Sequence, residues 1–185
     1  PDDLVRDYGC DSLRMYELFV GPPELDAEWD DRGIDGVNRF LKRLWNMLME
    51  SKEKDIQPTK EMIKLRHRMV YDITTRLESF SLNTVISGFM EYNNKFIEVA
   101  KKEGGIDKET LETIAVLLSP FAPHFAEEMW EQLGHVDTVF KAGWPKYDEN
   151  EMKDDEIKIP VQINGKTKAV IEIPADISKD DAIAA

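Results

Sequence analysis

The sequence is poor in cysteine, in basic residues and in long apolar runs. Its single cysteine, Cys10, excludes an internal disulfide framework and fits a reducing compartment. No apolar run approaches the roughly 20 residues of a membrane-spanning helix, and nothing resembles a signal peptide. The 24 Lys and Arg residues against 37 Asp and Glu residues give a net charge of -13, which argues against a general polyanion binder. We therefore expect a cytoplasmic protein that contacts neither membrane nor DNA.

The sequence also lacks the common signatures of catalysis. It has no Gly-rich phosphate loop, no Cys/His metal cluster and no recognisable pairing of a nucleophile with a base. The three histidines show no metal-ligand spacing. Paired carboxylates such as Asp30/Asp31 and Glu127/Glu128 are typical of solvated surface or of helix N-terminal charge in so acidic a chain. The sequence thus predicts no catalytic residue, no metal site and no cofactor within these 185 residues.

Apolar residues recur with a helical period through most of the chain. Hydrophobic residues make up 42% of it, enough for one domain with a core. Residues 1–20 carry two short helical patterns separated by Gly9, with Asp11 as the expected cap of the second. Longer helices are predicted by apolar residues at i, i+3, i+4 and i+7 over 35–50, 60–80, 83–101 and 107–118. The sequence therefore predicts a mainly α fold.

The stretch "LLSPFAPHFAEEMW" places two prolines between helical patterns. Proline inside a helix costs about 3 kcal/mol. The first helix must therefore stop near Pro120, whereas Pro123 suits the first position of a new helix. We expect His124 to pin this corner by a hydrogen bond, not to take part in catalysis or metal binding. The side chains expected to be largely buried here are Phe125 and Trp130.

After Trp144 the period changes from helix to strand. "IKIPVQI" and "KAVIEI" alternate apolar and polar residues on either side of Asn164-Gly165, a strong β-hairpin signal. Ser178 and Asp181 have capping-box spacing and predict a helix at the end of the chain. A lone hairpin is marginal in water, so this part is expected to begin a second, small α+β domain, and the chain to be a piece of a larger protein.

Basic residues are concentrated between residues 38 and 68. That range holds nine basic and four acidic residues, whereas residues 1–37 hold three basic and 11 acidic residues. Within the helix at 35–50, a polar stripe lies opposite the apolar face that contains Leu41, Leu44 and Leu48. An ordinary solvated face and a surface that follows a phosphate backbone both fit this pattern. The candidate RNA-contact residues are the stripe itself, Arg39, Lys42, Arg43 and Asn46, and the nearby Arg66 and Arg68.

Several stretches of the chain, in this order, resemble the bacterial leucyl-tRNA synthetase family: "PDDLVRDYGCDSLRMYELFVGPPE", "GIDGVNRFLKRLWN", "LLSPFAPHFAEEMWEQLG", "WPKYDE" and "VQINGKTKAVIEIP". The proline corner is shared with the isoleucyl, valyl and methionyl enzymes, whereas "GPPE", "GIDGVNRFLKRLW" and "VQINGK" favour the leucyl family. Cys10 departs from the alanine usual in that family, a small change. In the family, the first of these stretches follows the KMSKS-type loop of the catalytic domain.

The resemblance implies an ATP-dependent ligase that joins leucine to its tRNA. No HIGH-type motif, KMSKS loop or editing pocket occurs in this sequence, so ATP and leucine would be used outside it and the isolated chain is expected to be inactive. Residues 1–34 would form a junction after the catalytic domain and contact it. Residues 35–147 would form the α-helical anticodon-binding bundle, and residues 148–185 a linker and the start of a C-terminal α+β domain. The implied partner is leucine tRNA.

Two other interpretations remain open from the sequence. One is a protein-interaction helical bundle whose basic stripe is only solvated surface. The other is the equivalent region of an isoleucyl, valyl or methionyl enzyme. In the leucyl enzymes the bundle approaches the inner side of the tRNA without depending on anticodon bases. The sequence agrees with that role, because it has a basic stripe but few aromatic residues visibly placed to stack on bases.

Overall fold

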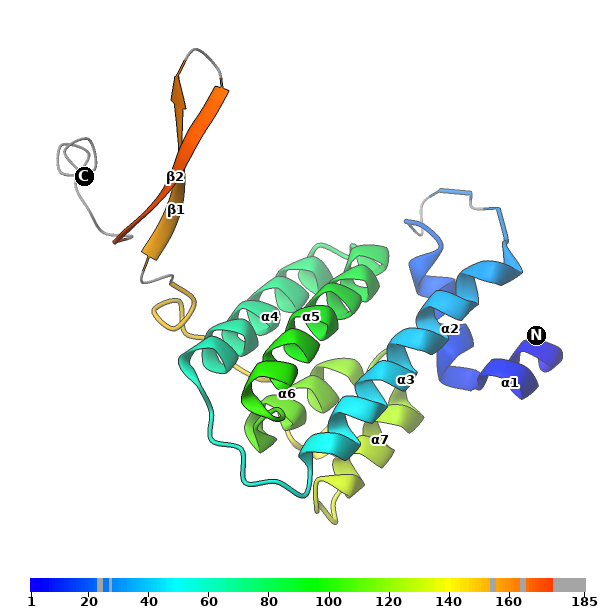
Figure 1. Ribbon diagram of the computed structural model, residues 1–185. Helices are drawn as coiled ribbons and strands as arrows, with labels where there is room; N and C mark the ends of the chain where they lie inside the picture. Colours follow the sequence, from blue (N-terminus) through cyan, green and yellow to red (C-terminus); the bar gives the residue numbers. More distant parts are fainter. Residues whose placement is uncertain (23–24, 27, 154–155, 164–165, 175–185) are drawn as a thin grey trace. The chain divides into compact units, whose positions relative to one another are not determined.

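A computed structural model describes residues 1–22, 25–26, 28–153, 156–163 and 166–174. The chain divides into two compact units, Pro1–Glu151 and Met152–Ala185. Within the described residues the first unit is built from α-helices and the second contains two strands (Figure 1). The predicted mainly α class is therefore confirmed. The finer division at residues 34 and 147 stays a prediction.

The helices of the first unit follow the predicted ranges closely. Gly9, with φ 85°, separates the first two helices, as expected for a residue without a Cβ. Short 3-10 turns, η1 (Asp31–Gly33) and η2 (Val139–Lys141), precede α3 and follow α7. The α-helices are α1 (Asp2–Tyr8), α2 (Cys10–Phe19), α3 (Ile34–Ser51), α4 (Lys60–Glu78), α5 (Leu82–Glu103), α6 (Lys108–Leu118) and α7 (Pro123–Gln132).

Side-chain caps define where several helices begin. The Thr59 hydroxyl accepts a hydrogen bond from the Met62 amide at the start of α4. The Asp107 carboxylate does the same for the Thr110 amide at the start of α6, at 3.0 Å. Each of these bonds satisfies an amide that has no partner within its own helix. At the other end of a helix, Gly104 adopts the left-handed conformation that terminates α5.

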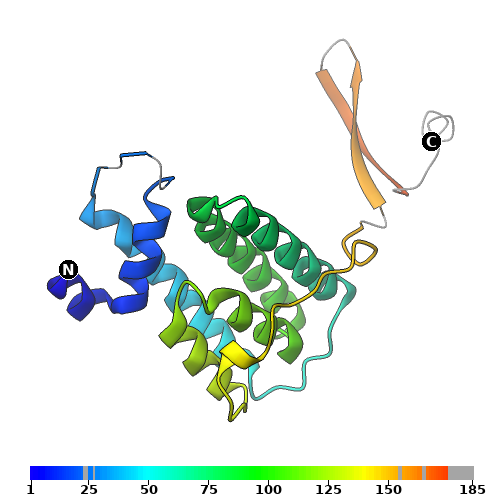
Figure 2. The same cartoon turned by 180° about the vertical axis from the view of Figure 1, so that it is seen from behind.

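The helices enclose one core. After the tight turn at residues 79–81, α4 and α5 pack side by side, and α6 packs against α4 and α7 (Figures 1 and 2). Helix α2 contacts α1, α3, α5 and α7, so the N-terminal helices belong to the same packed unit. The largest fully buried side chains are those of Met15, Ile34, Leu44, Leu48, Met62, Met69, Ile73, Ile86, Phe96, Ile106, Leu111 and Leu117.

The proline corner has the predicted backbone but different burial. Helix α6 ends at Leu118, and Pro123 occupies the first turn of α7, as predicted. His124 makes the expected hydrogen bond, from Nδ1 to Asp11 at 2.9 Å, yet its side chain is 75% exposed. Phe125 and Trp130 are only partly buried, because they lie at the rim of the core and not inside it. The expected packing of both rings against the core is therefore confirmed, but neither ring is fully buried.

Asp11 also differs from its predicted role. It lies inside the first turn of α2, whose N-cap is Gly9 and has no side-chain cap. Its carboxylate instead accepts a hydrogen bond from the Phe125 amide of α7 at 2.7 Å. The first turn of α7 has no side-chain cap from its own N-cap residue, Ala122, so Asp11 supplies that bond from a distant helix.

The second unit contains β1 (Glu156–Ile163) and β2 (Lys166–Pro174), which pair antiparallel. Ile159 lies opposite Ile171, and the register shifts between Val161 and Gln162. The predicted turn at residues 164–165 lies outside the described residues, as does the predicted helix after residue 178. Both stay predictions.

Candidate nucleic-acid interface

Helix α3 presents opposite faces to the core and to solvent. Leu41, Leu44 and Leu48 are buried, and Trp45 is half-buried at the edge of the apolar face. The predicted orientation of the helix is therefore confirmed. The four residues that we name the α3 stripe are all exposed: Arg39, Lys42, Arg43 and Asn46.

The cations of the α3 stripe make no hydrogen bond or ion pair with any described residue. Most other exposed cations in the described part of the chain behave differently. Lys108 lies 3.7 Å from Glu112, and Lys141 lies 3.1 Å from Asp137. In a protein with a net charge of -13, a row of unpaired cations is a local exception to the overall charge. Such a row can neutralise phosphates without first breaking an internal ion pair.

Two hollows flank the α3 stripe. The first, which we name the α2–α3–α7 hollow, has a volume of about 470 Å³ and includes Lys42 and Asn46 at its edge. The second, of about 230 Å³, lies between α3 and the end of α5 and includes Arg43, Asn46 and Lys101. Asn46 borders both hollows. Lys101 is exposed and adds a cation from α5 to this surface. The pattern of charged residues along α3 alone could not predict it.

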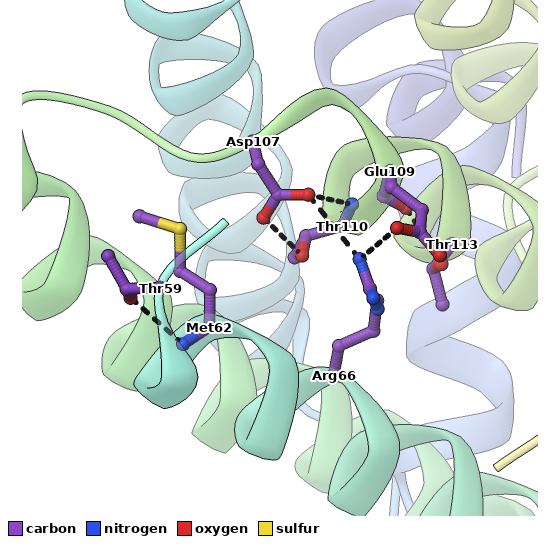
Figure 3. Close-up of polar contacts among 7 residues, drawn as sticks. All are labelled: Thr59, Met62, Arg66, Asp107, Glu109, Thr110 and Thr113. Carbon is purple, nitrogen blue, oxygen red and sulfur yellow. Dashed lines mark hydrogen bonds and ion pairs between the residues drawn. The ribbon is translucent and has the colours of Figure 1, made fainter. Parts of the chain in front are cut away.

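Arg66 does not belong to this surface. Its side chain is 9% exposed, and its guanidinium lies 3.4 Å from Asp107 and 2.9 Å from Glu109 (Figure 3). The same Asp107 carboxylate accepts hydrogen bonds from the Thr110 amide and hydroxyl, so Arg66 joins α4 to the capped start of α6. These ion pairs use the charge of Arg66 inside the protein and disfavour an RNA contact there, so the contact at Arg66 stays a prediction that the structure does not support.

Arg68 is half-buried and lines a different groove. That groove lies between α4 and α5 and includes Lys64, Lys95 and Glu98. Arg68 therefore faces a mixture of charges, away from the residues that line the two hollows beside α3. Its predicted contact with RNA stays a prediction.

A further hollow, along α7, is acidic. It has a volume of about 1040 Å³ and lies along α7 and the loop that follows it. Glu127, Glu128, Glu131 and Asp137 line it, which disfavours a phosphate backbone. Of these, Glu127 accepts a hydrogen bond from the Val139 amide at 3.1 Å and holds η2 in place. Among the described residues no group of three or more potential metal ligands occurs, and no helix is long and apolar enough to cross a membrane.

The sequence did not reveal that aromatic rings gather beside the α3 stripe. Tyr8, Trp45, His124 and Phe125 all line the α2–α3–α7 hollow. These residues come from the end of α1, from α3 and from the start of α7, up to 117 positions apart in the chain. No local pattern connects them, and only the packing of α2 and α7 beside α3 brings them together.

Comparisons with known proteins point to one family. Residues 59–183 match the family described as the anticodon-binding domain of tRNA ligase. The chain is 44% identical to a leucine-tRNA ligase of Fervidobacterium nodosum, covering 98% of this chain and 24% of that protein. It is 43% identical to a leucine-tRNA ligase of Parabacteroides distasonis, and this match covers 98% of this chain and 19% of that protein. The chain thus spans a quarter or less of the length of these relatives.

A solved structure also matches this chain. It is the crystal structure of the ternary complex of Agrobacterium radiobacter K84 agnB2 LeuRS with tRNA and LeuAMS. The TM-score is 0.83 at 26% sequence identity, and the match covers 100% of this chain and 25% of that one.

Proposed function

Because this chain belongs to the family of anticodon-binding domains of tRNA ligases, we propose that it is the tRNA-docking part of a leucine-tRNA ligase. Such a ligase attaches leucine to its tRNA with the use of ATP. The identities above 40% to leucine-tRNA ligases over nearly the whole chain support the leucyl member of the family. The likeness to a LeuRS–tRNA complex supports a role in tRNA binding.

The observation that carries the proposal is the α3 stripe. Arg39, Lys42 and Arg43 are exposed on one helix face of an acidic protein and have no charge partner among the residues that the structure describes. Their opposite face is fixed by the core, so the stripe is held in a rigid, solvent-facing row. Contacts from such a row to phosphates fix the position and orientation of an RNA without reading its bases.

The partners follow from this assignment. Leucine tRNA is the proposed nucleic-acid partner, and the remainder of the ligase, including its catalytic domain, is the proposed protein partner. ATP and leucine would be used by that remainder, so the chain alone would not activate leucine. A ligase of protein synthesis works in the cytoplasm, which agrees with a chain that holds one exposed cysteine.

Competition between tRNAs tests the assignment. Leucine tRNA labelled at one end is bound to the ligase that contains this chain, and unlabelled leucine or isoleucine tRNA is added. We expect leucine tRNA to compete at lower concentration, since the whole ligase selects its own tRNA. A preference for isoleucine tRNA would indicate the isoleucyl enzyme. Absence of any tRNA binding would favour a protein-interaction bundle.

A further inference from the structure

The α2–α3–α7 hollow is lined by rings. Trp45 and Phe125 meet edge to face with ring centroids 5.7 Å apart, and both are only partly buried. Tyr8 is also half-buried, and the His124 ring is largely exposed. Partly exposed rings around one hollow offer flat apolar surface to a ligand. A nucleobase is such a ligand, because every base has a π-face that stacks on aromatic side chains.

The volume and the polar groups of the hollow suit a base. Its volume of about 470 Å³ falls within the range of small-molecule sites. At its edge, the Asn46 side chain is exposed, and its amide can both donate and accept a hydrogen bond. Asp11 also lines the hollow, but its two carboxylate oxygens are already bound to His124 and to the Phe125 amide. The negative charge of Asp11 is thus directed at the positive end of α7.

The charges beside the hollow complement a nucleotide. Lys42 borders the hollow, and Arg39 and Arg43 lie within one turn of it on the exposed face of α3. A base in the hollow would therefore leave its phosphates beside unpaired cations. A segment of acidic or apolar protein would use either the cations or the rings, whereas an RNA nucleotide uses both.

We propose that the α2–α3–α7 hollow binds the base of one unstacked nucleotide of the tRNA whose phosphates follow α3. This inference rests on the proposed function, because it names what the same surface takes from the same tRNA. The base stacks against the rings of the hollow, with His124 as its exposed wall and Asn46 beside its edge. The contact adds affinity that depends on stacking and not on salt.

Replacement of His124 by asparagine separates the contribution of base stacking to tRNA affinity from the salt-dependent contribution of the phosphate contacts. Because Nδ1 faces a carboxylate, it acts as the donor to Asp11, and the amide nitrogen of asparagine can donate in the same place. His124→Asn thus removes the ring and keeps the bond. We expect tRNA affinity to fall by about 5- to 150-fold, the range for loss of one stacked base, with an unchanged slope of log affinity against log salt.

Phe80 provides the matched control. Its ring is 59% exposed, and its φ of 56° is one that asparagine tolerates well. Phe80→Asn therefore removes an exposed ring from the turn between α4 and α5 without strain, and tRNA affinity is expected to stay the same. Thermal unfolding of both variants shows whether each keeps its fold.

Cys10 allows the hollow to be filled chemically. It is the single cysteine of the chain, is exposed and lines the hollow. Alkylation of Cys10 with N-ethylmaleimide should obstruct the hollow and lower tRNA affinity as His124→Asn does, whereas the same treatment of a Cys10→Ala ligase, which shows the effect of any other cysteine, should not. Methylthiolation adds only a small group and is expected to have a much smaller effect.

The possible results distinguish a failure of the proposed base site from a failure of the proposed function. Suppose that alanine at Arg39, Lys42 and Arg43 lowers the salt slope, while the His124→Asn ligase and the ligase alkylated at Cys10 bind tRNA normally. The proposed base site is then wrong, and the proposed function stands. If none of these changes affects tRNA binding, both are wrong. If Cys10 resists alkylation in the ligase without tRNA, another part of the ligase covers the hollow and the base site is wrong.

Discussion

The carboxylate of Asp11, on α2, accepts a hydrogen bond at 2.7 Å from the backbone amide of Phe125, in the first turn of α7. Its other oxygen lies 2.9 Å from His124 Nδ1. The two helices are more than 100 residues apart in the chain, yet one carboxylate caps α7 and complements its positive N-terminal end. This bond fixes α2 and α7 as two walls of the hollow beside the α3 stripe.

Loss of the Asp11 carboxylate should destabilise the protein. Asp11→Ala leaves the Phe125 amide without its partner, and we expect the free energy of unfolding to fall by about 1–3 kcal/mol. Asp11→Asn keeps an oxygen that can accept this bond and should lose less. Urea unfolding of the three proteins measures the difference. Equal stability of wild type and Asp11→Ala would show that the bond contributes nothing.

Arg66 should act on stability and not on RNA. Its buried guanidinium pairs with Asp107, whose side chain is 3% exposed, so Arg66→Ala leaves that carboxylate without its charge partner. We expect a loss of about 3–5 kcal/mol in the free energy of unfolding. Arg66→Lys keeps the charge but lacks the planar fork, and should lose less stability than Arg66→Ala. Arg66→Ala removes the charge, yet the salt slope of tRNA binding should stay the same for the ligase that remains folded; a lower slope would restore Arg66 to the RNA surface.

Tyr92 should make the protein sensitive to alkaline pH. Burial, and then the hydrogen bond to Asp72 at 2.5 Å, raise the pKa of Tyr92 well above its ordinary value of about 10. Above pH 10 the unfolded tyrosine ionises while the folded one stays neutral, so stability is lost as pH rises. We expect wild type to lose more stability than Tyr92→Phe between pH 10 and 11, and equally little below pH 9. A constant difference across this range would contradict the raised pKa.

The Trp130 side chain should contribute less to the free energy of unfolding than an aromatic side chain inside the core. It is partly buried and stacks on His135 with centroids 3.7 Å apart, whereas Phe121 is buried and contacts Phe89. Phe121→Ala should cost about 3–5 kcal/mol, and Trp130→Ala about 2 kcal/mol, since less of its surface leaves water. Chemical unfolding compares the two variants. A larger loss at Trp130 would mean that its ring belongs to the core.

The sequence was sufficient to predict where the helices lie and which face of α3 is buried. Leucines at i, i+3, i+4 and i+7 fix which side of a helix is buried, so the exposed position of Arg39, Lys42 and Arg43 followed directly. Prolines and glycines marked the ends of helices for the same local reason. Where the period was strong, prediction and structure agree to within a few residues.

Contacts between distant residues could not be predicted in this way. Arg66 resembles Arg68 in sequence, and only the start of α6, 41 residues later, shows that it is buried in an ion pair. Asp11 resembled a cap of its own helix, whereas its carboxylate binds the first turn of the distant helix α7. The aromatic hollow likewise exists only because separate helices meet. Charge and period describe one helix at a time, whereas these features depend on packing.

The salt dependence of tRNA binding shows whether the α3 stripe follows RNA phosphates. Alanine at Arg39, Lys42 and Arg43 should leave the fold nearly intact, because exposed substitutions usually change stability by less than about 0.5 kcal/mol each. The matched control replaces Lys108, Lys141 and Lys146, which are exposed outside α3, and changes net charge equally. If the stripe follows phosphates, each lost contact reduces the slope of log affinity against log salt by about 0.7 to 0.9. We predict a lower slope and weaker binding for the stripe variant alone; equal slopes in wild type, stripe variant and control would show that the α3 stripe does not contact tRNA phosphates.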